Sequence, residues 1–498
     1  MDKNIYFKQS SFKQIQYNRY FYADKTRHIY NLIKNPQTKI FCRPSGFGKT
    51  LLLDTMAELF EGRKNLFSGL WIASSDYCFL KHPVIRLSLN IKNPVSPARV
   101  KNQLAAQLHE IACREELDIS PIRPDRPFDT LAVSLFNKYN PQAKPDPADL
   151  NLRKVVILID DYDAPILNSL DNPELATEIQ TLLSSYARSL KELENYCRLI
   201  LLAGQTKLGC QDRIQAGNFL RDISYEPEYA TICGFTFEDL DRLLALDSDS
   251  VISSLVMKNQ LKPGAGRDDL KEAILYWYDG YTFDGQTLLD DRNKESLPSV
   301  FNPYSILNFF HYRAFDSYWL KAHKPDFLSN IIAKNPIRFL ENDFSGYSTL
   351  ALNYADNPPL GILLFQTGYL TVKEVSASHN FLNYSLKVPN LEVSLAYRAA
   401  FLEILFSLDT EEAVRDNQRR LQQAIAAHSQ VDLEEIFSLA VARLAVRPSW
   451  PGDYFYRLVF QWFIYSLGLE SYPDHASGFN RAALVAEFFA SEKNRKKF

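Results

Sequence analysis

The stretch that decides the fold of this chain is residues 40–50, which read IFCRPSGFGKT. It begins with apolar residues, enters a loop of small residues and ends just before the apolar run 51–53. A loop of this kind between a strand and a helix turns its backbone N–H groups toward an anion at the helix N-terminus. The pattern predicts a phosphate-binding loop in which Lys49 contacts phosphates and Thr50 offers its hydroxyl to Mg²⁺.

The loop departs from the usual pattern G-x-x-x-x-G-K-[ST] at its first position, where this chain has Arg43. Its context supports the interpretation, because an apolar strand precedes it and apolar residues recur at helical spacing over 52–60. We therefore expect consecutive residues to bind the cofactor: Arg43, Pro44, Ser45, Gly46, Phe47, Gly48, Lys49, Thr50 and Leu51.

A second informative stretch, residues 155–161, reads VVILIDD. Consecutive branched apolar residues are typical of a strand buried on both faces of a parallel sheet. Asp160 would stand at the carboxyl end of that strand, where α/β sheets bind ligands, and can hold Mg²⁺ together with Thr50. Asp161 is then placed to orient and polarise an attacking water. The alternative is that the two aspartates only begin a turn.

Further strands are expected over 83–89 and 198–204, with helices over 100–117 and 175–190 between them, so the sheet is parallel. The last strand runs into Gln205, Thr206 and Lys207, any of which can sense a γ-phosphate or position water. Thr206 is our expected catalytic contact, although the residues do not decide among the three. A simple exit from strand to loop is the alternative.

Other polar residues near these segments have two interpretations each. Asp24 is expected to cap the helix that follows it, and a contact to a nucleotide base is the alternative. Arg213 and Arg221 are expected in a loop as solvated side chains, with a role as an arginine finger as the alternative.

The composition excludes several classes of protein. A formal net charge of −3 gives no overall attraction to nucleic acid. The six cysteines are scattered without a CxxC pair, which argues against zinc and favours a reducing, cytoplasmic location. The most apolar helix expected, near 458–469, is too short for a membrane span, and no signal peptide is evident.

From residue 234 onward the pattern predicts a helical lid, followed by a small β-containing connector. The order of segments resembles the bacterial AAA-ATPase-like family that carries a PD-(D/E)XK nuclease-like domain at its C-terminus. The matching stretches are 20–26, 43–50, 158–163, 226–230, 233–235, 277–281, 302–307 and 364–370.

That resemblance implies ATP and Mg²⁺ as ligands. It also accounts for Arg43 at the first position of the loop, because the family has arginine before proline there. The family's acidic strand usually ends in Asp-Glu, whereas this chain has the shorter Asp161. AAA-type proteins often form rings, so a homo-oligomer and an unidentified protein partner are both compatible with the resemblance.

The C-terminal segment departs from the family. The aspartate expected to hold metal falls on Ala483, and no E-x-K strand follows Glu487. We expect a degenerate or truncated nuclease-like domain, although a shifted alignment would promote Asp474, Glu487, Glu492 or Lys493 to ligands. Arg415, Arg419 and Arg420 are expected on a solvated helix face.

The sequence thus predicts an α/β fold: a P-loop NTPase parallel sheet with a helical lid, then a connector and a mostly helical, partial PD-(D/E)XK nuclease-like tail. The expected boundaries are 1–233 for the AAA-type ATPase core, 234–335 for the lid, 336–395 for the connector and 396–498 for the tail. The expected function is an ATP-hydrolysing, nucleotide-driven switch. The alternatives are a nucleotide-gated binding module without significant turnover and an ATP-controlled DNA nuclease.

Overall fold

The computed structural model describes residues 5, 11–34, 38–91, 95–119, 123, 126–146, 149, 151–209, 220–284, 299–319, 347, 350, 358–378, 381–395, 419–420 and 423. The chain divides into two units. One comprises Met1–His323 with Phe344–Asn390, and the other comprises Lys324–Asp343 with Leu391–Phe498. Nearly all described residues belong to the first unit, and every contact discussed below lies within it.

The core of this unit is a five-stranded sheet in the order β2-β3-β4-β1-β5. The strands are β1 (Thr38–Cys42), β2 (Val84–Ser88), β3 (Val155–Asp160), β4 (Cys197–Gly204) and β5 (Leu220–Asp222). All neighbouring pairs are parallel, so the predicted parallel α/β sheet is confirmed. The carboxyl ends of β1, β3 and β4 therefore meet at one edge, where parallel sheets bind ligands.

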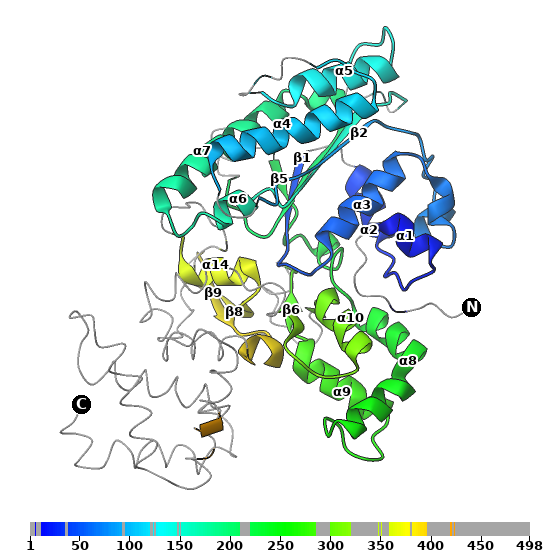
Figure 1. The fold of residues 1–498 in the computed structure, drawn as a ribbon, viewed down its shortest axis with the longest axis vertical. Coiled ribbons are helices and arrows are strands. Elements are labelled where there is room, and N and C mark those ends of the chain that lie inside the picture. The colour runs from blue at the N-terminus through cyan, green and yellow to red at the C-terminus, as the bar shows by residue number, and fades with distance from the viewer. Residues whose placement is uncertain are drawn as a thin grey trace, which may run out of the picture. The chain divides into compact units, whose positions relative to one another are not determined.

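Helices cover both faces of the sheet, as the connections between parallel strands require. They are α3 (Lys49–Phe60), α4 (Pro97–Arg114), α5 (Asp129–Tyr139), α6 (Ala164–Leu167) and α7 (Pro173–Lys191). Figure 1 shows α4 and α7 along one side of the sheet and α3 along the other. The predicted apolar stripe of α3 is buried, which fixes the helix that follows the loop at 43–48 against the sheet.

Two short helices precede β1, namely α1 (Phe12–Tyr17) and α2 (Thr26–Lys34). The Phe12 N–H donates to Asp54 of α3 at 2.6 Å, which ties α1 to that helix. Asp24 accepts from the backbone N–H of Thr26 at 2.9 Å, so the expected cap of α2 is confirmed. Single 3₁₀ turns lie at Lys64–Phe67, Trp71–Ser74, Glu194–Tyr196 and Pro227–Tyr229.

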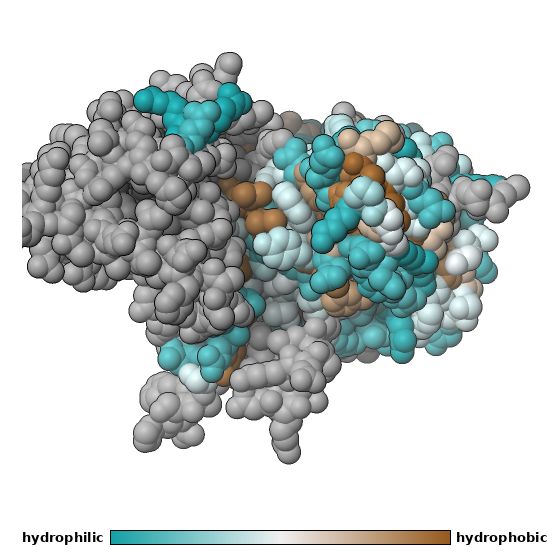
Figure 2. Space-filling view, turned by 90° about the horizontal axis from the view of Figure 1, so that it is seen from below, coloured by the Kyte–Doolittle hydropathy of each residue, from teal (hydrophilic) through white to brown (hydrophobic). Residues whose placement is uncertain are grey.

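The region expected to form a lid contains α8 (Phe237–Met257), α9 (Arg267–Tyr278) and α10 (Pro303–Tyr312), with the small antiparallel pair β6 (Tyr281–Thr282) and β7 (Ser299–Val300). It has its own apolar core, in which Leu243, Ile274 and Phe309 are fully buried. Figure 2 views it from below, with apolar residues set among polar ones. Met257 is the most exposed large apolar side chain, at 78%.

The connector contains α14 (Leu360–Thr367) and the antiparallel hairpin of β8 (Thr371–Ser378) and β9 (Phe381–Lys387). The expectation of strands is confirmed for the hairpin, but residues 360–367 form a helix that the sequence did not indicate. All residues of α14 after Leu360 are buried, and its two polar residues stand together at its end, so it has no exposed polar face from which a helical period could be recognised. No helix within the described residues is long and apolar enough to cross a membrane.

Candidate functional site

The loop between β1 and α3 is held in a shape that depends on two glycines. Gly46 and Gly48 have φ values of 82° and 96°, in the left-handed region that disfavours other residues. A Cβ on Gly46 would also lie 2.8 Å from Oδ1 of Asn302, so the loop and the start of α10 touch. The predicted loop is therefore built tightly against the lid.

Each backbone carbonyl of this loop, from Arg43 to Phe47, accepts a hydrogen bond. Nζ of Lys49 donates to the carbonyl oxygens of Arg43 and Pro44, at 2.9 and 3.1 Å. The carbonyl of Ser45 accepts from the Asn302 side chain at 3.2 Å and from the Trp319 indole at 3.0 Å. The carbonyl of Gly46 accepts from the backbone N–H of Tyr304 at 3.3 Å, and the carbonyl of Phe47 accepts from the backbone N–H of Gly234 at 3.1 Å.

Most N–H groups of the same loop, unlike its carbonyls, have no hydrogen-bond partners among the described residues. Within the described part of the chain, none of the amides of residues 45–51 donates to an acceptor. A run of unsatisfied N–H groups at a helix N-terminus is an anion site, because both the donors and the helix dipole favour negative charge. The loop can therefore hold phosphate with its backbone.

Thr50 and Asp160 come together beside this loop. Thr50 is exposed on the first turn of α3, and its hydroxyl hydrogen-bonds the carboxylate of Asp160 at the end of β3. Asp160 is only 5% exposed, and burial raises its pKa, as does the negative charge of Asp161. A hydroxyl and a carboxylate are hard oxygen ligands suited to Mg²⁺, which usually keeps several waters and phosphate oxygens as its other ligands.

Asp161 follows at the exit of β3 in a left-handed conformation, with φ of 49°. Its Oδ2 accepts from Nδ2 of Asn90 at 3.2 Å. Burial raises the pKa of Asp161, and the charge of Lys49 opposes that rise. Sequence analysis did not single out Asn90; its position just beyond the strand expected at 83–89 is the signal that could have found it.

Asp163 organises the loop that follows β4. Its carboxylate accepts from the N–H of Gln205 at 3.0 Å and from the N–H and hydroxyl of Thr206, both at 2.6 Å. Burial raises the pKa of Asp163, although these hydrogen bonds oppose the rise. Asp163 lies within the stretch 158–163, but its residue type and position alone indicated no role.

The three residues proposed to sense a phosphate have different surroundings. Thr206 is fully buried with its hydroxyl on Asp163, and Nζ of Lys207 forms an ion pair with Asp222 at 2.6 Å. Gln205 is half-buried, and its side chain makes no hydrogen bond to any residue that the structure describes. Gln205 is thus the side chain of the three that remains available to a ligand.

The guanidinium of Arg43, by contrast, does not face the free amides. It is 1% exposed and donates to the carbonyls of Cys42, Ser224 and Tyr229, the last at 3.0 Å. Burial lowers its pKa to about 10. In the structure this side chain ties the loop to residues 224–230.

One of the two arginines expected in a loop, Arg221, differs from expectation. Arg221 lies in β5 rather than in a loop, and its guanidinium binds both carboxylate oxygens of Glu226, at 2.8 and 2.7 Å. A paired arginine of this kind is not free to reach a neighbouring nucleotide. Arg213 lies outside the described residues.

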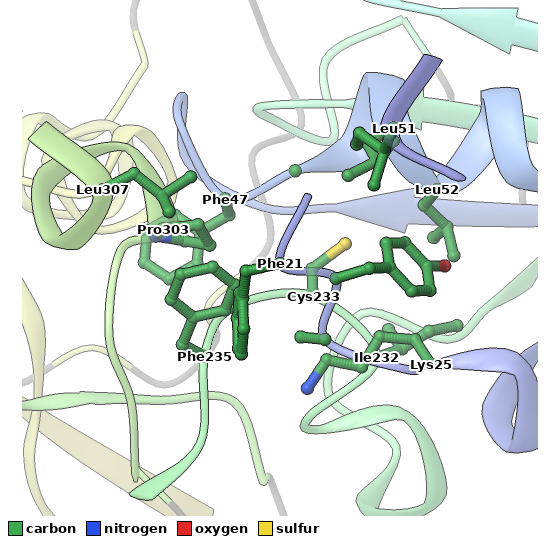
Figure 3. Close-up of a pocket in the computed structure, with 15 residues that line it drawn as sticks. Phe21, Lys25, Phe47, Leu51, Leu52, Ile232, Cys233, Phe235, Pro303 and Leu307 are labelled. Carbon is green, nitrogen blue, oxygen red and sulfur yellow. The ribbon is translucent and has the colours of Figure 1, made fainter. Parts of the chain in front are cut away.

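An apolar pocket lies next to the loop. Figure 3 shows it between the segment around Phe21, the start of α3 at Leu51, and Phe235 at the entrance to the lid. Lys25 also lines it and forms an ion pair with Asp239 of α8 at 3.0 Å. The pocket offers flat apolar and aromatic surface beside the free amides, as a planar organic group attached to a phosphate would require.

The metal-binding and nuclease-like residues expected near the C-terminus, Asp474, Glu487, Glu492 and Lys493, lie outside the described residues. Where the structure does describe the chain, it contains no group of three or more His, Cys, Asp or Glu side chains that could hold a metal ion.

Comparisons with known proteins find a matching family and a distant relative. Residues 8–213 match the model of a family described as predicted AAA-ATPase. The chain is also 27% identical over 476 residues to an Azotobacter chroococcum mcd 1 protein described as "Uncharacterized protein in vnfD 5'region", covering 94% of this chain and 84% of that protein. The family match includes β1 to β4 and the loop at 43–48, and the description of the family suggests a nucleotide-binding protein or ATPase.

Proposed function

We propose that this chain binds ATP with Mg²⁺ at the loop 43–51 and hydrolyses it. The observation that carries the proposal is the loop itself, in which the carbonyls of residues 43–47 are occupied while the amides of residues 45–51 are free, beside the pair Thr50 and Asp160. The match to a predicted AAA-ATPase family supports ATP as the nucleotide.

Lys49 has a defined part in binding. Its Nζ now donates to two neutral carbonyls, and phosphate oxygens are stronger acceptors because they carry charge. Lys49 would therefore exchange its carbonyl partners for the β- and γ-phosphates. The planar base would lie in the apolar pocket beside Leu51.

Thr50 and Asp160 are the residues that would hold Mg²⁺. When bound, the ion would neutralise charge on the phosphates. Asp161 would accept the hydrogen of the attacking water with its second carboxylate oxygen while Asn90 holds the first. A raised pKa suits this role, because a base whose pKa is closer to neutral takes a proton more effectively.

The lid gives the site a means of acting as a switch. Asn302, Tyr304 and Trp319 all bond to Ser45 or Gly46, so a change of the loop on nucleotide binding would reach the lid directly. We propose residues 1–233 as the ATPase core, 234–335 as the lid and 336–395 as the connector.

The test is Mg²⁺-dependent ATP turnover by the full chain beside Lys49→Ala and Asp161→Ala, with supercoiled plasmid in the same tubes. We expect both variants to lose about 10²–10³-fold in turnover and the plasmid to stay intact. Lys101→Ala, an exposed change on α4, is the matched control. Bound nucleotide without turnover would support a gated binding module instead, and cleaved plasmid would support the nuclease.

A further inference from the structure

The loop after β4 is held by two segments that are far apart in the sequence. Its successive N–H groups, those of Gln205, Thr206 and Lys207, are all occupied. The first two donate to Asp163, as described above. The third donates to Oε1 of Gln366 at 2.8 Å. One end of this loop is therefore positioned by the acidic segment after β3, and the other end by the connector.

Gln366 is fixed where it stands. It lies on α14 and is 2% exposed, and its Nε2 donates to the carbonyl of Leu350 at 2.6 Å. Both ends of the side-chain amide are thus hydrogen-bonded, and the N–H of Lys207 requires the oxygen to face it. A buried amide satisfied in this way has one orientation and transmits any movement of its helix.

The same helix also contacts the loop at 43–48. Gly368 ends α14 with φ of 94°, and a Cβ there would lie 2.6 Å from Cβ of Pro44. Phe365 stacks on Tyr225, with ring centroids 5.7 Å apart. Nζ of Lys207 lies over that same Tyr225 ring, 4.5 Å from its centroid. The connector helix therefore contacts both loops of the proposed ATP site.

We propose that Gln366 is a positioning residue for ATP hydrolysis, through which the connector helix α14 sets the rate of turnover. Gln366 fixes the Lys207 N–H and so the backbone that carries Gln205, the side chain left to meet the γ-phosphate or the attacking water. This rests on the proposed function. Of the two loops of the proposed site, Gln366 hydrogen-bonds to the one after β4, and its other bond goes to Leu350 in the connector. Its loss therefore lowers kcat and leaves nucleotide affinity in place.

The experiment compares steady-state ATP turnover of the full chain with three variants. Gln366→Met keeps the size of the side chain but removes both hydrogen bonds. Gln366→Glu keeps an oxygen for Lys207 and, when protonated in this buried place, can still donate to Leu350. Thr367→Val is the control, because Thr367 is equally buried on α14 and donates only within its own helix.

We expect Gln366→Met to lower kcat about tenfold with KM changed less than about twofold, and Gln366→Glu to recover most of the loss. Hydrogen exchange at residues 205–208 should also rise in Gln366→Met, while thermal unfolding shows that the variant is folded. Equal losses in Thr367→Val, an unchanged kcat in Gln366→Met, or a change confined to KM would overturn the proposal. A wild-type chain without turnover would instead overturn the proposed hydrolysis and, with it, this role of Gln366.

Discussion

The two loops at the carboxyl edge of the sheet have opposite backbone polarity. In the loop after β1, the carbonyls from Arg43 to Phe47 are occupied and the amides of 45–51 are free. In the loop after β4, the amides of Gln205 to Lys207 are occupied, and the carbonyl of Thr206 accepts from Sγ of Cys42 and the hydroxyl of Tyr162. The first loop can bind an anion with its backbone, whereas the second can act only through side chains.

This difference separates two kinds of effect. Changes in the first loop should alter nucleotide affinity, because the donors themselves are displaced. Changes around the second loop should alter turnover with little effect on affinity, because only the placement of side chains is lost. Three predictions test that separation, and a fourth tests the electrostatics of Asp161 beside the two loops.

The largest effect is expected for Gly46→Ala. The added methyl would lie 2.8 Å from Oδ1 of Asn302, and residue 46 has a left-handed backbone conformation that disfavours alanine. The steric clash and the backbone strain would each distort the loop. We expect affinity for ATP to fall about 10–100-fold by equilibrium titration, because misplaced donors lose charge-assisted bonds. Gly69→Ala is the control, since it has similar backbone strain, with φ of 80°, but open space around it. Equal weakening in both variants would argue against the loop.

Asp163→Asn should affect the second loop alone. The carboxylate accepts three hydrogen bonds, and an amide in its place would turn a donor toward one of the N–H groups. We expect kcat to fall about tenfold or more, with ATP affinity retained in the same titration. Asp268→Asn, an exposed change on α9, should match the wild type. A parallel loss of affinity would contradict the separation.

Thr206→Val tests the same loop more gently. It removes the hydroxyl bond to Asp163 but leaves the backbone N–H bonded. We expect stability to fall by about 1 kcal/mol in urea unfolding and kcat to fall less than in Asp163→Asn. A larger loss of kcat than in Asp163→Asn would show that Thr206 contacts the nucleotide itself.

The smallest effect is on the pH dependence of stability. Because burial raises the pKa of Asp161, the native chain keeps a proton that the unfolded chain has already lost between the two pKa values. Stability therefore falls as pH rises through that interval. Asp161→Asn removes this contribution, so its thermal unfolding should lose less stability over the same rise in pH. An identical slope in the two proteins would mean that Asp161 is not buried as described.

The sheet and the acidic residues could be predicted because their signals are local. The apolar run at 155–159 and the pattern at 46–50 each lie within a few neighbouring residues, and both structures were found where expected. The roles of Arg43 and Thr206 could not be predicted from such patterns. Both residue types suit phosphate, and only the tertiary structure shows that their polar groups are buried and already bonded.

The tertiary contacts that position the site could not be predicted from local sequence patterns. Asn302 and Trp319 are separated from Ser45 by 257 and 274 residues, and Gln366 is 159 residues from Lys207. No periodicity or spacing relates residues so far apart. The helix at 360–367 was missed for a different reason, since it is short, mostly apolar and buried nearly all round, and its polar residues Gln366 and Thr367 stand together at its end.

Hydrogen exchange with and without a non-hydrolysable ATP analogue and Mg²⁺ tests the central claim most directly. The free amides of residues 45–51 should exchange quickly in the unliganded chain and become protected on binding. The amides of 205–207, which are already bonded to side chains, should change little. Exchange at 45–51 that is the same with and without the analogue would contradict phosphate binding by this loop.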